Sequence, residues 1–300
     1  ESFYLFEIRP EEKYYASTRR ESFSKPVYAA QNPPYGIGIN CYFKDKPKEK
    51  PKLFIKNKTG ELIFEIRLRS ITGIQRSFWS FQQIPRTEDG EEIKVTGAGF
   101  VNPPIVDPGK YLVELEVDGN TIIKEAEVLP DPRYEISENE RKAQRAAQIR
   151  IMILSRKMGL SVTAVNGIDR GLEKLEEELN KTAQNIDELK ISLEEFGKKF
   201  EPFKEEIMPK GFGYRGSMEM TLRGGSISQL LLMEGMSIGG YPQAPAESDL
   251  KRIAELEMII QEMVERLNKI IRDDLPGLNA VIEKSGFKPL RVPDVIDLND

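Results

Sequence analysis

The sequence contains no histidine among its 300 residues. Within these residues, this absence excludes Ser-His-Asp and Cys-His catalysis and metal sites that depend on imidazole ligands. What stays open is the chemistry of carboxylates, of lysine nucleophiles and of calcium or magnesium bound through oxygen atoms. A hydrolase would need two acidic groups facing each other across a cleft. The sequence has 49 acidic residues, and no such pair stands out by spacing.

Cysteine is almost absent as well. The single thiol, Cys41, cannot form an internal disulfide, and it lies in the predicted strand GINCYFKD. In a strand a free thiol usually behaves as a small buried hydrophobic group. A catalytic thiolate would need a basic partner beside it. We therefore expect Cys41 to be structural.

Long apolar runs, excess positive charge and ligand-binding motifs are also missing. No stretch of about 18 uncharged apolar residues predicts a transmembrane segment. The net charge of −5 argues against nucleic acid as a partner. The glycine-bearing stretches GAGFVNPP and GGSISQ lack the lysine of a phosphate loop. Asp89-Gly90-Glu91-Glu92 lacks the alternating ligands of a calcium loop. We predict no catalytic residue, no metal site and no cofactor.

From about Phe3 to Pro130 the chain has the pattern of β-strands, beginning with FYLFEI. In the stretch GKYLVELEVDGNTIIKEAEVLP, Tyr111, Val113, Leu115 and Val117 share one face, and Asp118-Gly119 predicts a type I′ turn. Seven or eight such strands are typical of an immunoglobulin-like or fibronectin-like β-sandwich. We assign the sandwich to residues 35–132.

Residues 1–34 are predicted to be a linker that leads into the sandwich. Pro33 and Pro34 hold the chain extended, and Gly36 allows it to turn as the strand YGIGINCYF begins. A polyproline ligand for an aromatic groove is the functional alternative. Two prolines without a repeat favour the structural interpretation.

After Asp131-Pro132 the apolar period changes from 2 to about 3.6 residues. Ser137 and Glu140 form a capping-box pattern that predicts the start of a helix. Amphipathic patterns then predict helices to residue 180, over 182–208 and over 248–273, with a break at Leu275-Pro276. The predicted fold class is all-β plus all-α, with residues 133–300 forming an antiparallel bundle of long helices.

A glycine- and methionine-rich connection of low charge occupies residues 209–245. Connections of this length are often functional, and methionine suits adaptable contact surfaces. The segment could fold onto its own helices, contact a protein partner or contact a membrane. The predicted partner-contact residues are Leu230, Leu231, Leu232, Met233, Met236 and Tyr241.

Six segments of the chain carry a resemblance to a known family. In order they are NPPYGIGINCYFKD, GIQRSFWSF, VDPGKYLVELEVDGN, VLPDPR, GGYPQAPAESDL and LPGLNAVIEKSG. Each alone is a common strand, turn or helix pattern, but their order is distinctive and spans nearly the whole chain. Together they resemble the C-terminal region of exported bacterial proteins whose N-terminal half is a sortilin-like (BNR-repeat) β-propeller. Such proteins are often labelled glycosyl hydrolases.

The resemblance implies a function without catalysis. These 300 residues contain no propeller repeats and match no catalytic motif, so no propeller activity is carried over. The implied role is a structural and interaction module that docks a β-propeller domain or chain, with other subunits as further partners. The implied location is the periplasm, the outer membrane or the cell surface.

Two other functions stay open from the residues themselves. An accessory carbohydrate- or peptide-binding domain would need an aromatic platform, formed for example by Tyr35, Phe78 or Trp79. Of these, Trp79 is expected to belong to the core. A carboxylate-dependent hydrolase would need a cleft that holds two acids with separated pKa values.

Overall fold

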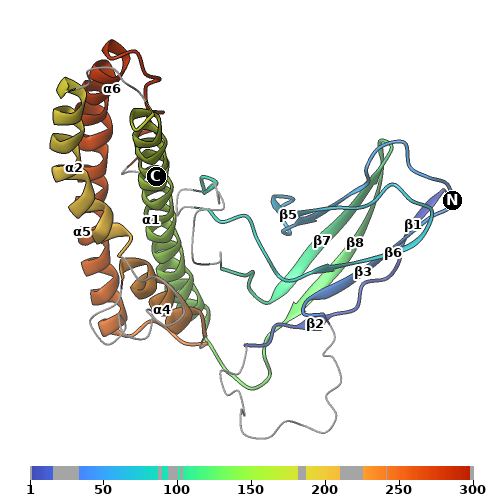
Figure 1. Ribbon diagram of the computed structural model, residues 1–300. Helices are drawn as coiled ribbons and strands as arrows, with labels where there is room; N and C mark the ends of the chain where they lie inside the picture. Colours follow the sequence, from blue (N-terminus) through green and yellow to red (C-terminus); the bar gives the residue numbers. More distant parts are fainter. Residues whose placement is uncertain are drawn as a thin grey trace, which may run out of the picture. The chain divides into compact units, whose positions relative to one another are not determined.

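The computed structural model contains both β-sheets and helices (Figure 1). It describes residues 2–15, 34–86, 90–93, 101, 104–181, 187–209, 226–240 and 242–297. Within these residues, strands lie before residue 130 and helices after residue 137. The predicted change from strands to helices is therefore confirmed.

Contacts between Cα atoms divide the chain into two compact units. Unit 1 is Glu1–Ile93, Pro103–Ile149 and Ile238–Ala244, and unit 2 is Lys94–Asn102, Arg150–Ser237 and Pro245–Asp300. This division differs from a single boundary at residue 132. Helix α1 (Glu138–Leu179) contributes its residues up to Ile149 to unit 1 and the rest to unit 2.

Unit 1 contains two sheets. The three-stranded sheet has the order β1 (Phe3–Leu5), β3 (Ile37–Phe43) and β6 (Gly73–Trp79). The five-stranded sheet has the order β2 (Glu11–Glu12), β8 (Asn120–Leu129), β7 (Gly109–Val117), β4 (Lys52–Lys56) and β5 (Leu62–Arg67). All neighbours pair antiparallel except β2 and β8, which are parallel.

The predicted linker of residues 1–34 contributes strands to both sheets. Phe3 and Leu5 of β1 are buried, and Phe3 pairs with Phe43 of β3. β2 adds a short parallel edge beside the end of β8. The early part of this segment therefore belongs to the sheets, because its alternate apolar side chains enter the same core. Pro33 lies outside the described residues.

Buried side chains from both sheets form one hydrophobic cluster. Trp79 is fully buried in it, with its ring 5.2 Å from that of Tyr111, and its indole N–H donates to the Gln82 carbonyl over 2.8 Å. Cys41 is buried in the same cluster, as predicted. The cluster also includes Ile37, Ile39, Phe43, Leu53, Ile55, Phe81, Val113, Leu115, Val117 and Val128.

The turn predicted at Asp118-Gly119 is present between β7 and β8. Asp118 and Gly119 have positive φ angles of 47° and 81° between β7 and β8, as a type I′ turn requires. Asp118 also accepts backbone N–H bonds from Lys48 and Glu49, which hold its pKa below the ordinary value.

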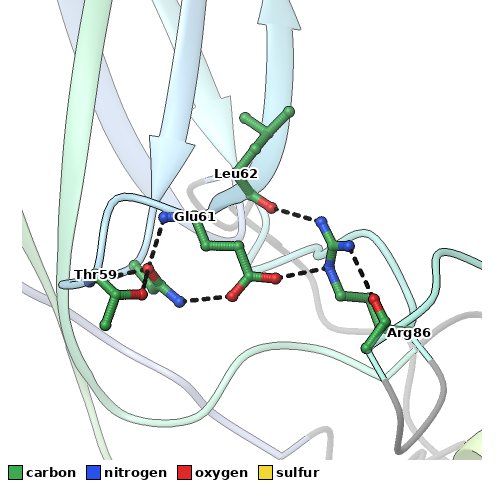
Figure 2. Close-up of polar contacts among 6 residues, drawn as sticks. Thr59, Glu61, Leu62 and Arg86 are labelled. Atoms are coloured by element: carbon green, nitrogen blue, oxygen red, sulfur yellow. Dashed lines mark hydrogen bonds and ion pairs between the residues drawn. The ribbon is translucent and has the colours of Figure 1, made fainter.

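The hairpin that joins β4 to β5 is held by side chains (Figure 2). The side-chain oxygen Oδ1 of Asn57 accepts the backbone N–H groups of Thr59 and Glu61 at 3.0 and 2.9 Å. The Glu61 carboxylate lies 3.0 Å from Arg86 Nε, and Arg86 also donates to the Leu62 carbonyl at 3.3 Å. The loop therefore ties the edge strand β5 to a distant part of the chain.

The predicted capping box opens α1. The Ser137 backbone N–H donates to Glu140 Oε2 over 2.8 Å, and the Glu140 N–H donates back to Ser137 Oγ over 3.3 Å. The helix then continues for 42 residues without a break, about 63 Å at 1.5 Å per residue.

Unit 2 contains most of the helical structure. After α1 come α2 (Asp187–Ile207), α4 (Ile227–Gly240), α5 (Glu247–Lys269), the π-helix η1 (Ile270–Asp274) and α6 (Leu275–Lys284). Ion pairs join three of these helices pairwise, and Figure 1 shows them side by side. The pairs are Arg150–Glu257 at 2.8 Å, Lys204–Asp169 at 2.5 Å and Arg266–Glu206 at 2.9 Å.

Two helical predictions need correction. The chain does not break at Leu275-Pro276: η1 carries α5 into α6 through a hydrogen bond from the Leu275 N–H to the Ile270 carbonyl, and Pro276 lies at the start of α6. The connection predicted over 209–245 contains the helix α4. Glycines at its end and a lack of charge hid the helical pattern in this segment.

No helix among the described residues is both long and apolar enough to span a bilayer.

Candidate functional site

Helix α4, which belongs to unit 2 up to Ser237, carries most of the residues predicted to contact a partner. Leu232, Met233 and Met236 are 42%, 56% and 65% exposed, and their i, i+1, i+4 spacing places them on one side of the helix. Leu231 is fully buried and Leu230 is half-buried. Tyr241 lies outside the described residues. Of the six predicted contact residues, only Leu232, Met233 and Met236 therefore lie together on an exposed surface.

The opposite side of α4 packs closely. A Cβ atom on Gly235 would lie 2.9 Å from the Val101 side chain and 3.5 Å from that of Ile151. Leu231 is one turn before Gly235 and is buried on the same side. Tight packing of the Leu231 and Gly235 side fixes α4 in place. The side with Leu232, Met233 and Met236 stays in solvent.

α4 also buries one carboxylate. Glu234 is 2% exposed, and its Oε1 has no hydrogen-bond partner among the described residues. Burial raises the pKa of Glu234, while Arg252 of α5, 3.3 Å from Oε2, opposes that shift. Sequence reasoning missed this group because a glutamate between apolar residues gives no sign of its burial.

A pocket lined by aromatic and charged side chains lies within unit 1. Its volume is about 340 Å³. The residues that line it come from the segment after β2, the segment just before β3, the segment before β7, the first turns of α1 and the end of α4. They include Lys13, Tyr14, Tyr15, Tyr35, Asp107, Arg141, Gln144, Arg145 and Gln148. None of these was predicted as a site residue except Tyr35, which was considered for an aromatic platform.

Lys13 is the most unusual residue of this pocket. It is only 6% exposed, and its ammonium group donates to the Val106 carbonyl over 2.8 Å. Burial lowers the pKa of Lys13 to about 8, with Asp107 opposing the shift and Arg145 and Arg141 adding to it. Lysine is almost always exposed, so the sequence gives no signal that would identify this position.

A salt bridge holds the tyrosine segment in place. The Asp131 carboxylate accepts the Tyr15 backbone N–H at 2.9 Å and Arg133 Nη2 at 2.6 Å. These bonds, those to Arg133 foremost, hold the pKa of Asp131 well below its usual range. The Arg133 guanidinium lies over the rings of Tyr14 and Tyr134, 5.6 and 5.3 Å from their centroids.

Tyr35 occupies an exposed position beside the pocket. Its ring is 5.1 Å from that of Phe81 in an edge-on arrangement, and its hydroxyl donates to the Tyr14 carbonyl at 3.2 Å. Burial of the hydroxyl end raises the pKa of Tyr35 to about 12. Trp79 and Phe78 do not join this surface, because Trp79 is fully buried and Phe78 does not line the pocket.

The arrangement restricts the chemistry available. Among the described residues that line the unit 1 pocket, Asp107 is the only carboxylate, so these residues do not supply the acid pair that a glycosidase needs. Burial raises the pKa of Cys41 to about 12, which keeps this thiol protonated. No group of acidic, cysteine or histidine side chains suited to a metal ion occurs among the described residues.

A second, larger groove lies in unit 2. It runs between α1 and residues 291–297, with Arg156, Arg170 and Arg291 among its lining residues and a volume of about 620 Å³. The extended chain beside it is held by Asn268 of α5, whose side chain makes 2.8 Å hydrogen bonds to both the backbone N–H and the carbonyl of Ile296. These bonds make that chain segment a fixed wall of the groove.

Neither a protein-family model nor a curated protein matches this sequence.

Proposed function

We propose that this chain is a non-catalytic interaction module that docks a β-propeller and presents a protein-binding surface on helix α4. In this proposal the two sheets form an immunoglobulin- or fibronectin-like sandwich and the helices form an antiparallel bundle. The order of the six sequence segments supports the β-propeller as partner and an exported location.

The observation that carries the proposal is the exposed side formed by Leu232, Met233 and Met236. Flexible, polarisable side chains at adjacent exposed positions are typical of adaptable contact surfaces. The helix beneath them is fixed by the close contact of Gly235 with Val101. A rigid base with adaptable side chains suits a docking role.

The experiment replaces the exposed apolar side chains of α4 with glutamine and leaves its buried side chains unchanged. We expect the variant L232Q/M233Q/M236Q to bind a β-propeller chain that copurifies with the native protein at least about tenfold more weakly, since central apolar contacts carry most of the binding energy. Isothermal titration calorimetry gives the affinity. Deleting 226–237 would be a poorer test, because it removes the buried Leu231.

The matched control is M258Q/I259Q, which removes equally exposed apolar side chains from α5. This variant should bind like the wild type. Equal affinity of the α4 variant and the wild type would contradict the role of α4. A native preparation in which no copurifying chain is a propeller would contradict the choice of partner.

A second candidate function is that of an accessory carbohydrate- or peptide-binding domain. The observation that favours it is Tyr35, 44% exposed and part of the lining of the unit 1 pocket. Tyrosine faces pack against sugar rings and peptide groups. Titration with neutral and charged sugars tests it, and loss of binding in Tyr35→Ala is the expected result.

A further inference from the structure

The unit 1 pocket has an excess of positive charge. Its described lining contains three cationic side chains, Lys13, Arg141 and Arg145, and one carboxylate, Asp107. Arg145 and Asp107 form an ion pair with each other. Asp107 also attracts Lys13, so this one carboxylate is shared between two cations and the described lining keeps an excess of positive charge.

The charge of Lys13 is costly because the residue is buried. An ammonium group has three N–H donors, and one of them meets the Val106 carbonyl at 2.8 Å. The ring of Tyr15 lies 5.7 Å from the nitrogen and offers a weak cation–π contact. A buried cation normally has an anionic partner close by. The one carboxylate near Lys13, Asp107, is already paired with Arg145, so the position of Lys13 favours an additional anion from outside the chain.

Arg141 supplies the geometry for a particular kind of anion. Its Nη1 donates to the Ile136 carbonyl at 2.7 Å, which fixes the guanidinium at the pocket wall. The planar fork of a guanidinium matches a carboxylate better than it matches a spherical ion. Arg141 and Lys13 line the same pocket and repel each other, and a carboxylate bound between them would offset that repulsion.

The rest of the pocket fits the body of a small polar ring. Tyr14, Tyr15 and Tyr35 contribute aromatic surface, and Gln148 contributes an amide group. The volume of about 340 Å³ lies at the lower end of the range for small-molecule sites. This size is that of a single sugar rather than of a folded partner.

We propose that the unit 1 pocket binds a sugar acid, with its carboxylate held by Lys13 and Arg141 and its ring packed against the tyrosines. This inference rests on the second candidate function and narrows it from carbohydrates or peptides to uronic acids. It assigns Lys13 and Arg141 as ligand-binding residues and requires no covalent step.

The test measures binding of galacturonate, galactose, inorganic phosphate and acetate to the full chain by calorimetry. We expect galacturonate to bind at least about tenfold more tightly than each of the other three, because charged hydrogen bonds add to ring packing. Lys13→Met and Arg141→Gln should each weaken galacturonate binding about tenfold or more. Arg76→Gln, an exposed arginine of the same unit, is the matched control and should bind like the wild type.

A pH series separates ligand binding from a merely structural role. The groups that face Lys13 are Asp107, Arg141, Arg145 and Tyr15. Because the pKa of Lys13 is lowered to about 8, galacturonate affinity should fall as the pH rises above 8 in the wild type. It should not fall in Lys13→Met. Circular dichroism verifies folding, and the pH series remains decisive if Arg141→Gln does not fold.

Each other outcome overturns a defined part of the proposal. Equal binding of galactose would overturn the sugar-acid inference and leave the second candidate function standing. If phosphate bound as tightly as galacturonate, the proposed preference for a carboxylate would be wrong. If acetate bound as tightly, the proposed contribution of the sugar ring to binding would be wrong. Binding of none of the four would overturn both the inference and a carbohydrate-binding role.

Discussion

Gly36 combines a backbone angle and a contact that together exclude a side chain. Its φ is 114°, and a Cβ atom there would lie 2.2 Å from the Trp79 carbonyl oxygen, just before Ile37 pairs with Trp79. We expect Gly36→Ala to lower the free energy of unfolding by about 1 to 3 kcal/mol. Urea unfolding measures this change. Gly167→Ala, in the open interior of α1, should instead stabilise the chain by about 0.5 to 1 kcal/mol. Destabilisation by both variants would contradict the argument.

Glu234 is a single residue whose charge opposes folding. Its pKa is raised in the folded chain, so the folded state holds its proton more tightly than the unfolded state does. This group therefore favours folding at acid pH, and that contribution is lost as the pH rises from about 4.3, the unfolded value, through the raised folded value. Glu234→Gln should be about 1 kcal/mol more stable than the wild type at neutral pH and equal to it at acid pH. Thermal unfolding across a pH series tests this. Exposed Glu255→Gln serves as the control, and a pH-independent gain would refute the explanation.

At the scale of elements, the side chain of Asn268 in α5 makes the hydrogen bonds to the extended chain at Ile296 that a neighbouring β-strand would otherwise make. Its side-chain amide bonds both backbone groups of Ile296, and Asn279 of α6 does the same for Leu290 at 2.7 and 2.9 Å. We expect Asn268→Ala to lower the free energy of unfolding by about 2 to 3 kcal/mol, since two buried backbone groups lose their partners. Gln261→Ala on the exposed side of α5 should cost well under 1 kcal/mol. A similar loss in both variants, measured by urea unfolding, would count against this role.

Elements with strong local signals were predictable from the sequence, and elements set by distant contacts were not. The turn at Asp118-Gly119 and the capping box at Ser137 follow from residues next to each other. α1 follows from a long apolar period. The β pattern that begins at Phe3 in FYLFEI is likewise confirmed by β1, but its three residues do not specify that the strand pairs with β3. α4 has a single charged residue, Glu234, and three glycines, so its sequence did not distinguish a helix from a loop.

The same limit applies to the candidate sites of the whole molecule. The exposed methionines of α4 stood out by composition and do lie on one side of a helix. The unit 1 pocket did not stand out, because it combines residues as far apart as Lys13, Tyr35 and Arg141. Each of these residue types is ordinary on a protein surface. Only the folded chain brings them together, and only there does the burial of Lys13 become visible.

The arrangement of the core predicts which part of the molecule can fold alone. Every buried residue of the sheet cluster lies between Phe3 and Val128, whereas Arg141 and Gln144 of the pocket belong to α1. A fragment of residues 1–136 should therefore fold cooperatively but fail to bind galacturonate. Trp79 is the only tryptophan and is fully buried, so its fluorescence reports on this core alone. A blue-shifted emission with a cooperative melt, together with lost binding, is the expected result, and the intact chain is the control. Emission like that of unfolded protein would show that the sheets need the helices to fold. Retained binding would show that α1 contributes nothing to the pocket.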